Sequence, residues 1–403
     1  MYTYVLVLLT VFFPTKYFIE YHIVILFTLV IYFIFNKTKF RVDNSVFIRI
    51  IFFLILWVAI DSILVSIYFL NDAYRNLSEV IRFLPLLILL MSFKSSPIDK
   101  QCVINSLFFY VFVVFVVCSL QFNRISLIEP ITNIYGDPKQ IEGSLNISQR
   151  ALGLSNGPGS NAAVLVVIYS YFLALFFSVE DKKNKLLSII SLSLSSFSIL
   201  LSQSQSGFLA LCLVTVYAVI FNLIFPYDKK SRKRSLFLFV FILVAIIPIV
   251  AKYWDELRYL LSLFDVGLER NSYQRREEKV LSTVELITSS PILFFVIGYG
   301  KDYIPDSTAL DNEYLFLLSV YGVVIFLCIM CFYLMIILRS WLVRVKDSNY
   351  LALHFVIIAG MILSWPSSFL LNPCTFVLLA IFISIYLANR EVYFENCSVG
   401  SCK

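Results

Sequence analysis

Charged residues are scarce in this sequence. They make up 14% of its 403 residues, whereas 60% are hydrophobic and the mean hydropathy is +0.87. Because a soluble domain devotes about a quarter of its residues to charge, this composition excludes a soluble enzyme or binding module. It indicates an all-α polytopic membrane protein, which we expect to form one integral membrane domain over residues 1–403.

Several chemical signatures are also missing. The 2 histidines and 8 cysteines have no metal-ligand spacing and predict no disulfide framework. Neither a glycine-rich phosphate loop nor a dinucleotide fingerprint is present, so we expect no cofactor and no metal. The net charge of +6 arises in short loops between apolar runs, so nucleic acid is not an expected partner. The N-terminal run lacks the basic start and small-residue end of a removable signal peptide.

Long hydrophobic runs are abundant. Crossing the hydrocarbon takes roughly 20 helical residues, and on this basis we predict about twelve transmembrane helices. Their expected ranges are 2–13, 17–35, 46–70, 80–93, 102–122, 151–178, 186–202, 206–225, 235–251, 312–338, 350–370 and 374–388.

Lysine and arginine gather in alternate short loops. These basic residues are Lys37, Lys39 and Arg41; Lys94 and Lys100; Lys182, Lys183 and Lys185; Lys229, Lys230, Arg232, Lys233 and Arg234; and Arg339, Arg344 and Lys346. Because cytoplasmic loops carry the excess of Lys and Arg, one orientation places all of them inside, with both termini cytoplasmic. The loops 71–79, 123–150, 203–205, 252–311 and 371–373 then lie outside, and 252–311 is by far the largest.

On this topology the polar residues at helix ends gather on the outer side. They are Glu20, Arg75, Glu79, Arg82, Arg150, Asn156, Asn161, Gln203, Gln205, Arg275, Arg276, Asp311 and Glu313. This asymmetry indicates a site at the outer membrane–water boundary. A reaction there has no ATP, so it requires a donor that arrives already activated on a lipid.

The large outer loop contains a predicted amphipathic helix over about 272–290. Apolar residues recur at helical spacing, Arg275 and Arg276 lie in its first turns, and Glu277 and Glu278 lie on other faces. A guanidinium group binds phosphate in a bidentate fork and keeps its charge. The alternative is a surface helix that is only solvated by its Arg and Glu residues.

Two further outer segments carry polar groups at helix starts. The segment from Arg150 to Asn161 includes Asn156, three glycines and Pro158, so its backbone amides are available to an anion at the start of the next helix. Ser202 to Gly207, which includes Gln205, is a polar hairpin suited to sugar hydroxyls or phosphate oxygens. For both segments an ordinary wet turn remains an open alternative.

Three ionisable positions lie near or inside apolar runs. Arg82 follows Glu79 by one helical turn, which suits either a structural ion pair or a second phosphate ligand. Asp61 falls in the middle of a span and requires a partner or a water-filled cavity. We expect His22 and His354 to pack or to hydrogen-bond within helices.

The outer segments also resemble motifs of the O-antigen polymerase and ligase family of glycosyltransferases. Arg150 to Asn161 is similar to the family's Arg…Gly…Pro-Asn segment at the start of a helix. Ser204 to Gly207 lies where the family often has Ser-Arg followed by a small residue. The twelve predicted spans and the large outer loop before the tenth span resemble the family's topology.

The resemblance continues after the amphipathic helix. Arg276 with Pro291 and the Gly298-Tyr299-Gly300 segment resembles the family's Arg…Pro…Gly-x-Gly run. Asp311 to Leu315 with Gly322 resembles His-Asn-x-Tyr-Leu…Gly. The sequence departs from the pattern twice, because Gln205 replaces an arginine and Asp311 replaces the histidine associated with ligase-type activity. The second departure favours a polymerase.

The resemblance implies a GT-C-like fold and a reaction at the periplasmic face of the bacterial inner membrane. An O-antigen polymerase moves a growing polysaccharide from undecaprenyl pyrophosphate onto a single lipid-linked repeat unit. The implied partners are these two lipid-linked glycans, membrane lipids and a polysaccharide chain-length regulator. The released pyrophosphate carries developing negative charge that the site must stabilise.

We therefore expect the following roles for the outer residues. Arg276 holds the pyrophosphate, assisted by Arg275, Arg150 and Arg82, and Gln205, Asn156 and Asn161 contribute to substrate binding. Asp311, Glu313, Glu278 or Glu277 orients or deprotonates the acceptor hydroxyl.

Other functions stay open on this sequence. An O-antigen ligase would use the same scaffold with lipid A core as the acceptor. A lipid-linked oligosaccharide flippase or other transporter also has about twelve helices, although transporters typically contain internal repeats and midplane polar sites. A purely structural membrane scaffold does not account for the outer arginines.

Overall fold

The computed structural model describes residues 2–35, 46–69, 74–92, 98–178, 181–226, 231–236, 271–289, 291–301, 312–343, 348–365 and 368–398. Every regular element in these ranges is helical, as the sequence predicts. The long helices are α1 (Tyr2–Phe12), α2 (Phe18–Phe35), α3 (Val46–Phe69), α4 (Tyr74–Ser92), α5 (Lys100–Phe122), α8 (Pro158–Ser178), α9 (Lys182–Ser202), α10 (Gln205–Ile224), α13 (Asn271–Ser289), α15 (Glu313–Val343), α16 (Ser348–Ser364) and α17 (Pro373–Ser398). Short helical elements are η1 (Ser126–Ile128), α6 (Glu129–Tyr135), α7 (Pro138–Gln140), η2 (Ile141–Ile147) and α14 (Ile292–Ile297).

The structure is that of a polytopic membrane protein. In the described part of the chain, 7 helices are long and apolar enough to cross a bilayer: Phe18–Phe35, Arg49–Tyr68, Lys100–Phe122, Pro158–Ser178, Lys182–Ser202, Gln205–Ile224 and Glu313–Arg339. Three shorter apolar helices are Tyr2–Phe12, Ser348–Ser364 and Pro373–Ala388. The expected span 235–251 lies almost entirely outside the described residues. The total of twelve spans stays a prediction.

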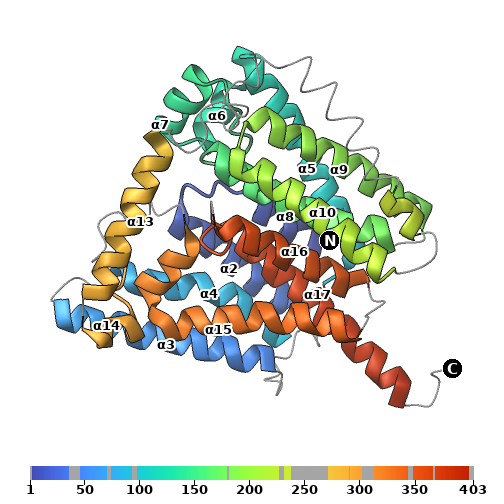
Figure 1. Ribbon diagram of the computed structural model, residues 1–403. Coiled ribbons are helices and arrows are strands. Elements are labelled where there is room, and N and C mark those ends of the chain that lie inside the picture. Colours follow the sequence, from blue (N-terminus) through green and yellow to red (C-terminus); the bar gives the residue numbers. More distant parts are fainter. Residues whose placement is uncertain are drawn as a thin grey trace.

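The centre of the helical assembly is α8. Nearly all of its residues are buried, whereas only a third of α2 and of α3 is buried. It packs against α9, α10, α16 and α17 (Figure 1). A helix that is apolar on all sides is stable when other helices surround it, so α8 forms the core while α2 and α3 expose apolar side chains as lipid-facing helices do.

Helix α8 is shorter than the expected span 151–178. The helix begins at Pro158, because Gly153 takes a left-handed conformation with φ of 60° and residues before Pro158 form turns. Gln121 of α5 stabilises this non-helical segment, since its Oε1 accepts hydrogen bonds from the amides of Leu152 (2.9 Å) and Gly153 (2.8 Å).

A second correction concerns the expected span 350–370. Helix α16 ends at Ser364, and the chain then turns into a loop that leads to α17 at Pro373. Trp365 follows the end of the helix. Residues 366–367 lie outside the described residues.

Helix α15 is broken near its N-terminus. Gly322 has φ of 75° and ψ of 175°, which is not a helical conformation. The segment after α14 packs against this break, so that the amide of Tyr299 donates to the carbonyl of Ser319 (2.8 Å) and that of Gly300 to Val320 (3.1 Å). A Cβ atom at Gly298 or Gly322 would collide with the opposite backbone, so both glycines are needed for the crossing.

Candidate functional site

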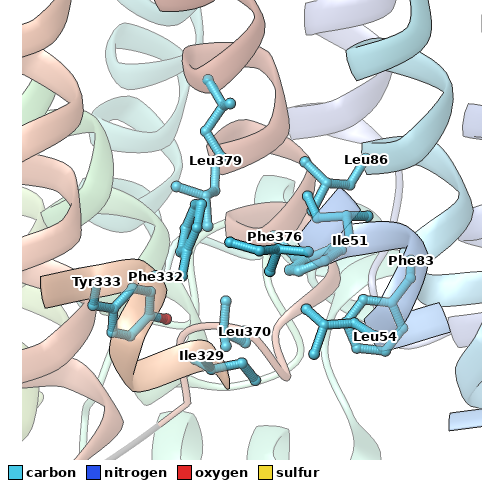
Figure 2. A pocket seen from close by; sticks show the side chains of 12 residues that line it. Ile51, Leu54, Phe83, Leu86, Ile329, Phe332, Tyr333, Leu370, Phe376 and Leu379 are labelled. Carbon is cyan, nitrogen blue, oxygen red and sulfur yellow. The ribbon is translucent and has the colours of Figure 1, made fainter. Parts of the chain in front are cut away.

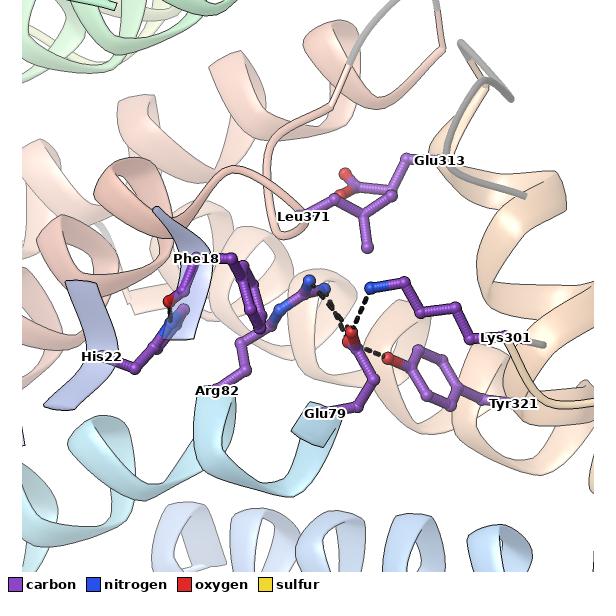
Figure 3. A network of polar contacts seen from close by, with 8 residues as sticks. All are labelled: Phe18, His22, Glu79, Arg82, Lys301, Glu313, Tyr321 and Leu371. Carbon is purple, nitrogen blue, oxygen red and sulfur yellow. Dashed lines mark hydrogen bonds and ion pairs between the residues drawn. The ribbon is translucent and has the colours of Figure 1, made fainter. Parts of the chain in front are cut away.

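A buried polar network joins α4, α15 and the segment after α14 (Figure 3). Its centre is the carboxylate of Glu79, which is fully buried. Lys301 Nζ lies 2.8 Å from Glu79 Oε1, and Arg82 Nη1 lies 3.1 Å from Oε2. The hydroxyl of Tyr321 donates to Oε2 at 2.5 Å. Two cations around one carboxylate leave the cluster with a net charge of +1.

Each member of this network is placed by a local feature of the chain. Glu79 and Arg82 lie one turn apart on α4, as their spacing predicts. Tyr321 directly precedes the break of α15 at Gly322. Lys301 directly follows Gly300, whose amide donates to the Val320 carbonyl near the break of α15. This contact places the Lys301 side chain within reach of Glu79.

An aromatic ring separates these cations from the histidine of α2. The Phe18 ring centroid lies 4.9 Å from Arg82 Cζ and 5.2 Å from Lys301 Nζ, which gives two cation–π contacts. The Phe18 ring centroid also lies 4.4 Å from the ring centroid of His22. His22 Nδ1 is 2.7 Å from the Phe18 carbonyl and donates to it, as expected for a histidine that bonds within its helix.

Glu313, an expected catalytic carboxylate, anchors a loop. It is fully buried, and its oxygens accept hydrogen bonds from the Ser364 hydroxyl (2.5 Å) and the amides of Phe369 (3.0 Å) and Leu371 (2.6 Å). The same loop reaches α8, because Asn372 Nδ2 donates to Ser160 Oγ at 2.9 Å. These contacts hold the Glu313 carboxylate against the loop before α17, and its role in proton transfer stays a prediction.

The two polar segments on either side of α8 and α9 do come together. Asn161 Nδ2 donates to Ser202 Oγ at 2.8 Å, and the amide of Ala151 donates to the Leu201 carbonyl at 3.1 Å. Ser204 caps α10 by accepting from the Gly207 amide. Asn161 is therefore a buried crosslink inside the first turn of α8.

The other residues of these two segments that the sequence predicts for the site are Gln205, Arg150 and Asn156. Gln205 is half-buried at the start of α10, and Arg150 is half-buried before α8. The Asn156 carbonyl accepts from the Asp137 amide at 3.1 Å, which ties the segment to the outer cap formed by α6, α7 and η2.

Helix α13 is confirmed within the large outer loop over Asn271–Ser289. Arg275 and Arg276 lie in its first turns, but their side chains are outside the described part. Glu277 and Glu278 are exposed, and Tyr299 Oη bonds the Leu286 carbonyl at 3.0 Å, which fastens the helix to the Lys301 segment. Asp311 lies outside the described residues.

An apolar pocket lies between α3, α4, α15 and α17 (Figure 2). Phe83 directly follows Arg82, and Leu370 lies between the two residues whose amides bind Glu313. The lining residues are Ile50, Ile51, Leu54, Phe83, Leu86, Ile329, Phe332, Tyr333, Leu370, Phe376, Leu379 and Ile383. The pocket and the Glu79 network therefore share helices α4 and α15.

Asp61 is the other carboxylate on this side of the molecule. It is buried on the face of α3 that also carries the pocket residues Ile51 and Leu54. Its Oδ1 has no hydrogen-bond partner among the described residues.

Sequence reasoning missed Lys301 and Tyr321 as members of the site. Lys301 looks like an ordinary loop lysine, and Tyr321 like one of 24 tyrosines in an apolar chain. The one available signal was the Gly298-Tyr299-Gly300 segment, which marks a close backbone approach just before Lys301. Among the described residues, no three His, Cys, Asp or Glu side chains form a group that could hold a metal ion.

Comparison with known proteins adds no identification. No protein-family model matches this chain, and no curated protein matches it.

Proposed function

We propose that this protein is an O-antigen polymerase of the inner membrane. It transfers a growing polysaccharide from undecaprenyl pyrophosphate onto a lipid-linked repeat unit at the periplasmic face. The observation that carries the proposal is the cluster of Arg82 and Lys301 around Glu79, together with an apolar pocket that is lined by the same helices α4 and α15. An anionic head group and an isoprenoid tail need these two environments side by side.

The chemistry requires few protein groups. The acceptor hydroxyl attacks the anomeric carbon of the donor, the bond from that carbon to the diphosphate oxygen breaks, and the hydroxyl proton passes to a base. Diphosphate is a good leaving group, so catalysis consists mainly of orienting the acceptor and stabilising negative charge. Arg82 and Lys301, with Arg276 and Arg275 from α13 and Arg150, supply that charge. Asp311, Glu313, Glu278 and Glu277 are the candidate bases, and of these Glu313 also holds its loop.

Arg276→Ala tests the role of the outer arginines. In a strain whose own gene is deleted, we expect this variant to leave single-repeat lipopolysaccharide without the long-chain ladder. Arg276→Lys recovers little, because a point charge does not reproduce the guanidinium fork. Gel banding of lipopolysaccharide at matched membrane expression is the measurement, and a normal ladder from Arg276→Ala removes this residue from the mechanism.

The deletion strain separates the polymerase from the ligase. Loss of a ligase removes all glycan from the lipid A core, whereas loss of a polymerase leaves one repeat unit on it.

A lipid-linked oligosaccharide transporter is the second candidate. The break of α15 at Gly322 and the buried Asp61 favour it, because broken helices and intramembrane charges line transport pathways. Formation of polymer by the purified protein from lipid-linked units excludes a transporter, since transport changes the location of the glycan but not its length.

A further inference from the structure

Glu79 occupies the two cationic donors, Arg82 and Lys301, that a phosphate group would also use. Its Oε1 accepts from Lys301 Nζ (2.8 Å) and Arg82 Nη2 (3.4 Å), and its Oε2 from Arg82 Nη1 (3.1 Å) and Tyr321 (2.5 Å). A carboxylate clamped between a guanidinium and an ammonium group has the surroundings of a bound phosphate. The protein therefore carries an anion of its own at the cationic cluster.

Lys301 is the more accessible of the two cations. Its side chain is 19% exposed, whereas those of Arg82 and Glu79 are 6% and 1% exposed. Without Glu79 the two cations would lie buried close together, a costly arrangement in the absence of a ligand.

We propose that Glu79 is a built-in counter-ion, displaced from Arg82 and Lys301 by the diphosphate head of an isoprenoid lipid and returning when the diphosphate leaves. This inference rests on the proposed function for the identity of the ligand. No covalent bond changes in the exchange, because the two cations move from one set of oxygens to another. The exchange weakens ligand binding and thereby speeds product release.

Glu79→Gln is the decisive variant. It removes the competing charge, keeps the side-chain size, and leaves an amide oxygen for Tyr321. We expect the full-length variant in nanodiscs to bind farnesyl diphosphate at least tenfold more tightly than the wild type. Lys301→Gln should bind it at least tenfold more weakly, and Glu142→Gln, on the exposed outer cap, should match the wild type. In a transfer assay Glu79→Gln lowers KM and kcat together, because the product leaves slowly.

The opposite results overturn the proposal. Unchanged or weaker binding by a folded Glu79→Gln protein means that Glu79 only holds the cations in place. If size-exclusion chromatography shows that this variant does not fold, Tyr321→Phe decides, since it removes one of the donors to Glu79 without changing any charge. We expect it to bind farnesyl diphosphate a few-fold more tightly, and unchanged or weaker binding contradicts the exchange.

The binding result is separable from the proposed function. If Glu79→Gln tightens binding but the wild type transfers no glycan, the counter-ion role of Glu79 is supported and the polymerase function is contradicted. If transfer occurs and Glu79→Gln leaves binding unchanged, the polymerase function is supported and the counter-ion role is contradicted.

Discussion

Individual carboxylates in this protein are distinguished by the groups that bind them. Glu79 faces two cations, Glu313 faces a hydroxyl and backbone amides, and Glu278 is exposed on α13. From sequence, Glu313 and Glu278 were equivalent candidates for the base. Only the first can be assigned a structural role, because its oxygens are occupied by the loop that joins α16 to α17.

Glu313→Gln separates a positioning role from a catalytic one. The substituted amide loses the charge and turns an N–H group toward the loop's own donors, so we expect a loss of about 1.5–3 kcal/mol in stability. Thermal unfolding in detergent measures the change. The matched control Glu285→Gln, on the exposed face of α13, should stay within about 0.5 kcal/mol of the wild type. Unchanged stability with abolished transfer would instead assign Glu313 a direct catalytic role.

Residue spacing predicted some of this site and missed the rest. The contact between Glu79 and Arg82 follows from their spacing of one helical turn. The contact between Asn161 and Ser202 became visible only in the structure. Lys301 lies 222 residues from Glu79, and nothing local to either residue specifies their contact. Such a pair depends on how the whole chain returns through the large outer loop.

At the scale of elements, the break in α15 determines the geometry of the site. It lets the backbone of Gly298 to Gly300 pack against Ser319 and Val320, and this crossing fixes the start of the Lys301 side chain. The break was hidden in the sequence because residues 312–338 read as one continuous apolar run. A single glycine in such a run is compatible with an unbroken helix.

Gly322→Ala tests this crossing. The positive φ of residue 322 is strained for alanine, and the added Cβ atom would collide with the carbonyl oxygen of Val296. We expect a loss of at least about 1–3 kcal/mol in stability and weaker farnesyl diphosphate binding, because Lys301 is displaced. Unfolding and binding measurements on the purified protein check both effects.

The matched control for this variant is Gly143→Ala. A Cβ atom at Gly143 has open space around it, so stability and binding should both be unchanged. Equal behaviour of the two variants would show that the α15 break does not position the cation.

At the scale of the whole molecule, hydrophobic runs predicted the architecture well. The long apolar helices of the described chain overlap the expected runs, and the largest differences are at the start of α4, the start of α8, the end of α16 and the end of α17. The runs do not determine which helices cross the bilayer completely. In the described part of the chain, 7 helices are long and apolar enough to do so. The polarity of the outer helix ends, rather than the number of spans, is what supports a site at one face.

The central claim is that this site joins lipid-linked sugars into a chain. The most direct test supplies purified, reconstituted protein with undecaprenyl-pyrophosphate-linked repeat units and follows product length by gel over time. We predict a ladder that grows with time, and no ladder with Arg276→Ala. Units that cross the bilayer but remain single repeats would contradict the account and identify a transporter.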